Sequence, residues 1–160
     1  MNTLTKVLAG TVVGAAVIAG YRYFRALKKA KDYLLAIPQV KVHSLSLTGL
    51  VIRIDVTLKN PTTASFKIKF PFVEIKYKNA VIGTSQVINK DIKIPKYGEA
   101  VIEQIMVTIP LTSVFSVAIS LVKALKNKEP VKVSATVKTI INLGWTQLDY
   151  EDTQELPLKV

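Results

Sequence analysis

Few residues of this chain could carry out acid-base or nucleophilic chemistry. The sequence contains one histidine, His43, and no cysteine. Ser44 and Ser46 lie beside the histidine and Asp55 follows in the next expected strand, so the residue types of a hydrolytic triad are present. Neither a nucleophile elbow nor the spacing of a histidine metal site accompanies them. We therefore expect a protein that is not an enzyme and binds no cofactor.

A group of acidic residues near the C-terminus could in principle collect a calcium ion, because calcium prefers oxygen ligands. The group consists of Asp149, Glu151, Asp152 and Glu155. Its spacing matches no calcium-binding loop. We expect a solvated edge strand here and no metal site.

Lysines alternate with apolar residues along two neighbouring segments. They are Lys67 and Lys69 in the first segment, and Lys76 and Lys78 in the second. If the two segments pair as strands, all four ammonium groups share one solvent-exposed face, which attracts phosphate groups. The face lacks the interleaved aromatic residues or arginines that read nucleic acid. We expect either a simply solvated face or a non-specific contact with an anionic surface, such as lipid head groups or a nucleic-acid backbone.

The composition limits the architecture that could position these residues. With 160 residues and 17.6 kDa, the chain has room for one domain and a short appendage. A content of 49% hydrophobic and 21% charged residues is too apolar for a disordered chain and too polar for a protein with several membrane spans. The net charge of +11 favours anionic partners without choosing among nucleic acid, a membrane surface and an acidic protein.

An uncharged segment near the N-terminus predicts a membrane anchor. Residues 7–21 carry no charge, but as a helix they rise only about 22 Å. Residues 4–24 rise about 31 Å, close to the thickness of the hydrocarbon core, if Lys6 and Arg22 reach the two membrane surfaces. The bulky, basic sequence that follows lacks a small-residue cleavage site, which favours an uncleaved anchor over a secretory signal peptide.

Basic and aromatic residues follow this segment, as is typical of the water–membrane interface. Only Lys6 precedes it, so the positive-inside rule places the C-terminal domain on the cytoplasmic or interior side. The chain up to Ile37 can continue as an amphipathic helix along anionic head groups. The expected interface residues are Tyr21, Arg22, Tyr23, Arg25, Lys28, Lys29 and Lys31.

Gly10 and Gly14 lie four residues apart within the anchor. Small residues at this spacing allow two membrane helices to pack closely. Membrane helices are also rich in glycine for other reasons, so self-association stays open.

After Pro38 the apolar residues alternate, which is typical of strands. The clearest expected strand has its inner face at Leu50, Ile52, Ile54, Val56 and Leu58. Seven or more short strands separated by turn residues predict an antiparallel β-sandwich. Residues 111–127 have apolar side chains at helical spacing and predict one amphipathic helix packed on it. The expected division is therefore 1–37 for the anchor and juxtamembrane helix, and 38–160 for the sandwich.

Residues of about 40–110 resemble the water-stress and hypersensitive-response domain shared with the group 2 late embryogenesis abundant, or desiccation-related, proteins. The matching positions are Asn60-Pro61, Phe66-x-Ile68, Tyr77-x-Asn79, Ile82-Gly83, Ile94-Pro95 and Gly98. One departure is Ala80, where the family commonly has glycine after the asparagine. A tight type I′ turn would need a positive φ at Ala80, so we expect a different turn type there.

The resemblance implies a fibronectin-III-like β-sandwich of about seven strands with one helix, often preceded by a membrane segment, and no catalytic activity. The matched turn and core residues are then structural. The function expected is a membrane-anchored structural or protective module with a stress role. The alternative is a structural component of a lipid-containing virion or another large membrane-bound assembly, whose basic face would contact other proteins of the particle.

Overall fold

The computed structural model describes residues 21–22, 25, 33–46, 49–110 and 115–158. Tyr21, Arg22, Arg25 and Tyr33 have helical conformation. Within the described ranges, no helix has the length and apolar character needed to cross a bilayer. The expected anchor over residues 4–24 lies outside the described residues except for Tyr21 and Arg22, and so do Gly10 and Gly14.

The described chain forms nine strands and one helix, against the about seven strands that the resemblance implied. In chain order they are β1 (Leu35–Leu45), β2 (Gly49–Lys59), β3 (Phe66–Lys69), β4 (Phe72–Tyr77), β5 (Ala80–Ser85), β6 (Asp91–Ile94), β7 (Glu99–Pro110), α2 (Phe115–Lys126), β8 (Lys132–Asn142) and β9 (Gln147–Pro157).

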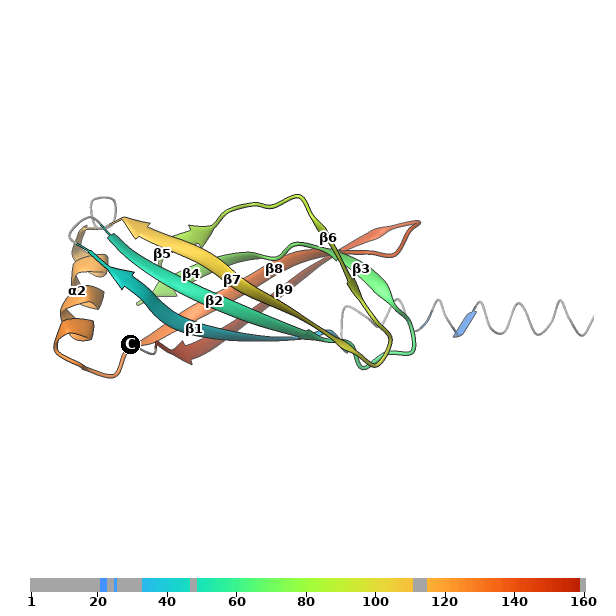
Figure 1. Cartoon of the computed structure of the whole chain (residues 1–160), viewed down its shortest axis with the longest axis horizontal. Helices are drawn as coiled ribbons and strands as arrows, with labels where there is room; N and C mark the ends of the chain where they lie inside the picture. The colour runs from blue at the N-terminus through green and yellow to red at the C-terminus, as the bar shows by residue number, and fades with distance from the viewer. Residues whose placement is uncertain (1–20, 23–24, 26–32, 47–48, 111–114, 159–160) are drawn as a thin grey trace, which may run out of the picture.

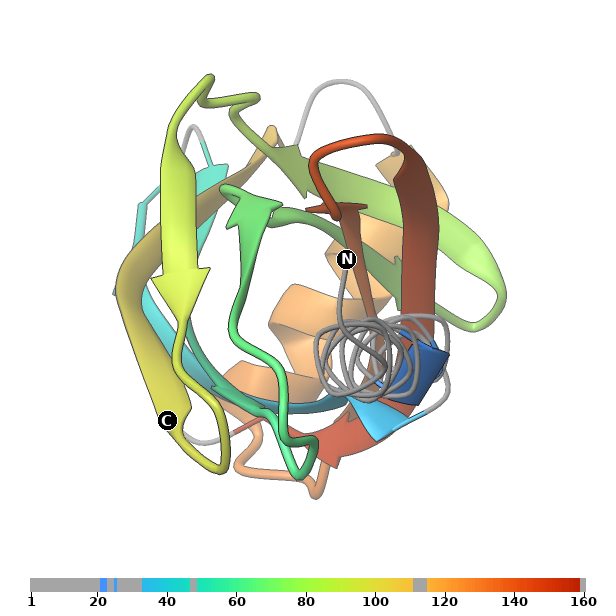
Figure 2. The ribbon, with the colours of Figure 1, turned by 90° about the vertical axis from the view of Figure 1, so that its right-hand side faces the viewer.

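The strands form one antiparallel sheet that folds back on itself. Their order is β1-β2-β7-β5-β4-β8-β3-β6, and β9 pairs with β8. Seen along the long axis, β1–β2–β7 face β4–β8–β9 across a common interior, and α2 lies across the far end (Figure 2). The mainly β, antiparallel sandwich with one helix is therefore confirmed.

The core follows from the alternation of apolar residues in the strands. All five predicted inner residues of β2, from Leu50 to Leu58, are completely buried. α2 adds Leu121 and Leu125 to the same core. Burying one such side chain contributes about 1.5–3 kcal/mol, so this stripe is a large part of the stability of the fold.

The start of the sandwich differs from the expected boundary at Pro38. β1 begins at Leu35, and Ala36 is completely buried opposite Leu58. Leu35–Ile37 therefore belong to the sandwich, not to a juxtamembrane helix. Pro38 is tolerated within β1 because β1 pairs with β2 alone and an edge strand can lack one amide donor.

The turn between β4 and β5 also differs from the expectation. Its central residues are Lys78 and Asn79, with φ of 49° and 63°, and Tyr77 pairs with Ala80. Two positive φ values in a two-residue hairpin are the pattern of a type I′ turn. Ala80 follows the turn, so the glycine that the family prefers there is not required for it.

Candidate functional site

The antiparallel registers bring four separate segments to one end of the sandwich. Leu35 pairs with Lys59 and Lys59 pairs with Glu99, so the start of β1 adjoins the loops that follow β2 and precede β7. Lys67 pairs with Asn142, which brings the β8–β9 loop to the same end. We define the proximal end as residues 33–35, 60–65, 95–98 and 143–146, with the adjoining ends of β3 and β6. It lies at the right in Figure 1, opposite α2 at the distal end.

A buried asparagine joins two of the proximal loops. The Asn60 side-chain nitrogen donates hydrogen bonds to the carbonyl oxygens of Ala64 and Pro95, both at 2.8 Å, and its oxygen accepts one from the Thr62 amide at 3.0 Å. The Tyr97 amide in turn donates to the Thr62 carbonyl at 3.0 Å. Asn60 is therefore structural, and it fixes the backbone that presents Tyr97.

The loop between β8 and β9 presents the only tryptophan of the chain, Trp145. The Leu143 amide donates to the Thr146 carbonyl at 3.0 Å and the Gly144 amide donates to the Asn142 side chain at 2.9 Å. Gly144 has a φ of 92°, a conformation that other residues rarely adopt. The loop is thus a defined turn with Trp145 at its tip.

Exposed aromatic side chains gather at the proximal end. Tyr97 is 69% exposed, Trp145 56% and Tyr33 52%. Tyr21, which is 60% exposed, lies in the segment leading to this end. Every other aromatic side chain whose burial the structure describes is buried or half-buried. Exposed tryptophan and tyrosine are typical of surfaces where an apolar medium meets water.

Three lysines at this end are exposed and form no ion pair with a described residue, although the charge of Lys67 acts on the Asp91 carboxylate. Lys67 of β3 and Lys93 of β6 lie directly opposite each other, and Lys96 follows in the next turn. The acids close to them in the sequence are already engaged, since Asp91 bonds Lys69 at 2.7 Å and Glu99 bonds Lys59 at 4.0 Å. Like charges placed opposite each other repel, so this arrangement costs stability unless an anion offsets it.

The predicted four-lysine face is not formed, because β3 and β4 do not pair with each other. They lie one after the other along the same edge of β8. Lys67 lies at the proximal end, Lys69 is bonded to Asp91 at 2.7 Å, and Lys78 lies in the distal β4–β5 turn over the Tyr77 ring. Whether any of these lysines contacts an anionic surface stays a prediction.

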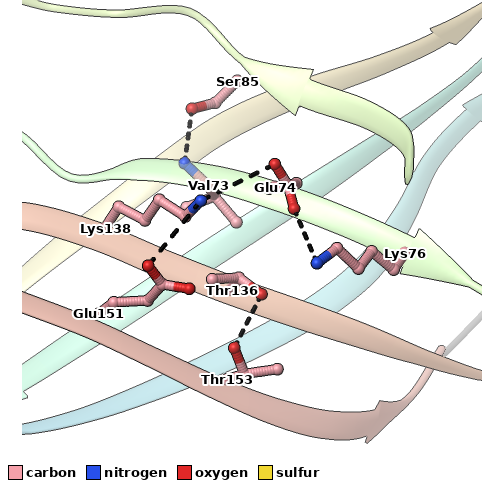
Figure 3. Close-up of polar contacts among 8 residues, drawn as sticks. All are labelled: Val73, Glu74, Lys76, Ser85, Thr136, Lys138, Glu151 and Thr153. Atoms are coloured by element: carbon pink, nitrogen blue, oxygen red, sulfur yellow. Dashed lines mark hydrogen bonds and ion pairs between the residues drawn. The ribbon is translucent and has the colours of Figure 1, made fainter. Parts of the chain in front are cut away.

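Lys76, the fourth of this set, lies in a row of alternating charges on the outer face of β4, β8 and β9 (Figure 3). Glu74 bonds Lys76 at 3.1 Å and Lys138 at 4.0 Å, and Lys138 also bonds Glu151 at 3.9 Å. The hydroxyls of Thr136 and Thr153 share a hydrogen bond of 2.9 Å beside them. Because its charges are compensated, this face is a poor site for anions.

The residues considered for catalysis are not brought together. His43 lies at an exposed irregularity of β1, whereas Asp55 pairs with Gln39. The Asp55 carboxylate accepts hydrogen bonds from Arg53 at 3.0 Å and from the Gln104 amide at 2.9 Å. Burial raises the pKa of Asp55, but these two hydrogen bonds outweigh it and hold the pKa below its ordinary value. Asp55 thus holds the β2–β7 bulge at Gln104.

The four acidic residues near the C-terminus lie along β9, and three of them are engaged separately. Glu151 pairs with Lys138, Glu155 pairs with Lys132 at 3.6 Å, and Asp152 accepts a hydrogen bond from Gln154 at 2.7 Å. Among the described residues, no three acidic or histidine side chains are grouped so that they could hold a metal ion.

Of the expected membrane-interface residues, the structure describes three. Tyr21, Arg22 and Arg25 are exposed, and the Arg25 guanidinium lies over the Tyr21 ring at 5.9 Å. The others, Tyr23, Lys28, Lys29 and Lys31, lie outside the described residues.

An open apolar groove of about 560 Å³ lies along the side of the sandwich, between residues 86–90 and strands β8 and β9. Its apolar walls are Phe70, Phe72, Val87, Ile88 and Ile140. The lysines at its rim, Lys69 and Lys138, are both paired with acids. The groove's two lysines therefore offer no uncompensated positive charge that would select an anionic ligand.

Sequence reasoning missed Trp145, Tyr97, Lys93 and Lys96 as members of a site. They lie in separate loops and a short strand, and no local pattern links them. The signal available in the sequence was a large aromatic residue next to a glycine that marks a turn, as in Tyr97-Gly98 and Gly144-Trp145.

Comparison with known proteins places the fold but not the function. No family model and no curated protein matches the sequence. A solved structure from Arabidopsis thaliana is 12% identical, with a TM-score of 0.54, covering 80% of this chain and 82% of that one. A protein from Archaeoglobus fulgidus is 10% identical, with a TM-score of 0.52, covering 79% of this chain and 97% of that one. These two likenesses show a shared fold alone.

A late embryogenesis abundant protein is also among the structural neighbours. It is 14% identical, covers 94% of this chain and 88% of that one, and has a TM-score of 0.39. A likeness at this level carries no argument about function, and membership of that family is not shown.

Proposed function

We propose that this chain is a membrane-anchored, non-enzymatic β-sandwich protein that acts as a structural or protective module at a membrane surface. One observation carries the proposal. Residues 7–21 are uncharged and are followed by basic Arg22 and Arg25, in a chain whose folded domain begins only at Leu35. An apolar segment placed before a complete sandwich has no part in that sandwich's core, so a bilayer is the natural medium for it.

The structure supports the proposal through the way the chain enters the sandwich. Ten residues separate Phe24 from Leu35. They can span about 35 Å at most when extended, and about 15 Å as a helix. An anchor over residues 4–24 therefore keeps the proximal end close to the bilayer at all times.

The non-enzymatic part of the proposal rests on how the candidate catalytic groups are used. Asp55 holds a bulge and His43 lies apart from it. Glu151 and Glu155 of β9 pair with lysines, and Asp152 accepts a hydrogen bond from Gln154. The protective role is drawn from the sequence resemblance at positions such as Asn60 and Gly98.

Membrane fractionation tests the anchor and its orientation. The full chain with a C-terminal tag is expected to stay in the membrane pellet after washing in high salt, which removes proteins held by charge alone. Protease added to closed vesicles with the cytoplasmic side inside should leave the tag intact. Recovery of the chain in the supernatant would contradict the anchor, and loss of the tag would contradict the orientation.

A drying experiment separates a protective role from a purely structural one. Vesicles that carry the full chain should retain more trapped dye after drying and rehydration than vesicles without protein. Equal leakage would contradict protection. Co-purification with a particle at fixed stoichiometry would instead favour the alternative of a component of a large assembly.

A further inference from the structure

We infer that the proximal end docks on the lipid bilayer, with Tyr97 and Trp145 in the interfacial layer and Lys67, Lys93 and Lys96 against the phosphates of anionic lipids. The inference rests on the proposed anchor and adds an orientation to it. The sandwich stands on its proximal end, with α2 directed away from the membrane.

The first support is the placement of the aromatic residues. Tyr97 and Trp145 come from different turns, yet both are strongly exposed at one end of the molecule. Hydrogen bonds within and between loops hold the two turns, through Asn60 for one and Asn142 for the other. Two amphipathic rings carried by hydrogen-bonded turns match the layer in which tryptophan and tyrosine concentrate in membrane proteins.

The second support is the charge beside these rings. Lys67, Lys93 and Lys96 make no ion pair with a described residue, in contrast to Lys69, Lys76 and Lys138. Lysines within a Debye length of an anionic leaflet are attracted to it. The repulsion between opposed Lys67 and Lys93 would be relieved by a phosphate group between them.

The third support is geometric. β7 has 12 residues, so the sandwich is about 40 Å long. The chain joins it at the proximal end through residues that reach about 35 Å at most. The distal end also carries lysines, such as Lys123 and Lys126 in the last turn of α2. That end could reach the bilayer only if residues 25–34 extended beyond their maximum length of about 35 Å. Because residues 25–34 join the anchor to the proximal end, they raise the effective concentration of that end at the bilayer.

Trp145 provides the test, because its fluorescence is the only tryptophan signal of the chain. The full chain is reconstituted into vesicles of equal parts phosphatidylcholine and phosphatidylglycerol, and only floated vesicles are measured. Brominated lipids quench tryptophans that lie in the membrane. We expect blue-shifted emission and a loss of about half of the fluorescence, as for an interfacial residue. Emission that matches water-exposed tryptophan and is not quenched would overturn the docking.

A matched control moves the tryptophan to the side of the sandwich. The variant W145F/V87W places it at a position that is 84% exposed beside the apolar groove. Its fluorescence should not be quenched. Quenching of this variant equal to that of the wild type would show that the groove side faces the membrane and would overturn the proposed orientation.

A charge variant tests the part assigned to the lysines. In K67Q/K93Q/K96Q, quenching of Trp145 should fall in the anionic vesicles and approach the value found with phosphatidylcholine alone. Unchanged quenching in this variant would overturn the proposed contact between the lysines and lipid phosphates. Docking would then depend on the aromatic residues alone. Absence of the protein from the floated vesicles would contradict the anchor itself, so failure of the proposed function is distinguishable from failure of the docking.

Discussion

The hydroxyl of Tyr150 donates a hydrogen bond to the carbonyl oxygen of Leu34 at 3.1 Å, across 116 positions of the chain. The same hydroxyl accepts one from the Ala36 amide at 3.2 Å, and the Gln154 side chain donates to the Ala36 carbonyl at 2.6 Å. β1 and β9 share no backbone ladder. Side chains of the last strand therefore close the sandwich at the point where the N-terminal segment joins it.

Replacing Tyr150 by phenylalanine should lower the free energy of unfolding by about 1–3 kcal/mol, because it leaves the buried Ala36 amide and Leu34 carbonyl without partners. Chemical denaturation measures this change. Tyr97→Phe is the control, since that ring is 69% exposed, and it should change stability by less than about 0.5 kcal/mol. Equal effects of the two substitutions would contradict the role given to the Tyr150 hydroxyl.

The stability of the protein should fall between about pH 10 and pH 12. Burial, together with the nearby Asp152 carboxylate, raises the pKa of Tyr150 to about 12, against 10.0 for the free side chain. The folded state then holds a proton that the unfolded state releases, so the stabilisation is complete below pH 10 and is lost as the pH rises through 12. Denaturation curves across this range check the loss. In Tyr150→Phe the loss of stability between about pH 10 and pH 12 should be smaller. An equal loss in that variant would show that other groups cause it.

Replacing Asp55 by asparagine should destabilise the protein by about 1–2 kcal/mol at pH 7, since it removes the charged acceptor of the Arg53 bond. The lowered pKa of Asp55 means that its contribution is present above the ordinary value near 4 and is lost as the pH falls through the folded-state pKa. The difference between wild type and D55N should therefore shrink below pH 4. A difference that stays constant down to pH 2 would show that the carboxylate charge is not involved.

The double variant K78N/N79G should raise the free energy of unfolding by about 1 kcal/mol. Both positions have positive φ, and an Asn-Gly pair adopts the type I′ turn with less strain than Lys-Asn. Thermal denaturation measures this increase. The control is K126N/N127G at the end of α2, which should give no such increase because neither position has a positive φ. No increase at the β4–β5 turn would contradict the turn assignment.

Alternation of apolar residues was enough to predict the sandwich and the buried stripe of β2, because each strand has one face in the core. The expected start of the sandwich at Pro38 was wrong, because β1 begins at Leu35. Proline often occupies the first position of a strand, so the sequence suggested a start there, whereas an edge strand also accepts proline within it. The turn at Lys78-Asn79 was placed one residue late, because it lacks the glycine that usually marks a type I′ turn.

The candidate site was harder to predict, because strand register decides it. Lys69 and Lys76 follow the same alternation, but the chain continues along β8 after Phe70-Pro71 instead of reversing, so the two lysines belong to different ion pairs. Tyr97 and Trp145 come to the same end of the fold only through the pairings of β3 with β6 and β8. No local pattern encodes such pairings.

The most direct test of the membrane anchor is flotation of the full chain with vesicles in a density gradient at high salt. The wild type should float. The variant V13K/V17K places two charges within the uncharged segment at a cost of about 2.5–3.5 kcal/mol each, and it should stay at the bottom. V87K/I88K adds the same charges to the exposed side of the sandwich and should float like the wild type. Wild-type protein at the bottom of the gradient, or V13K/V17K floating with the vesicles, would contradict the anchor.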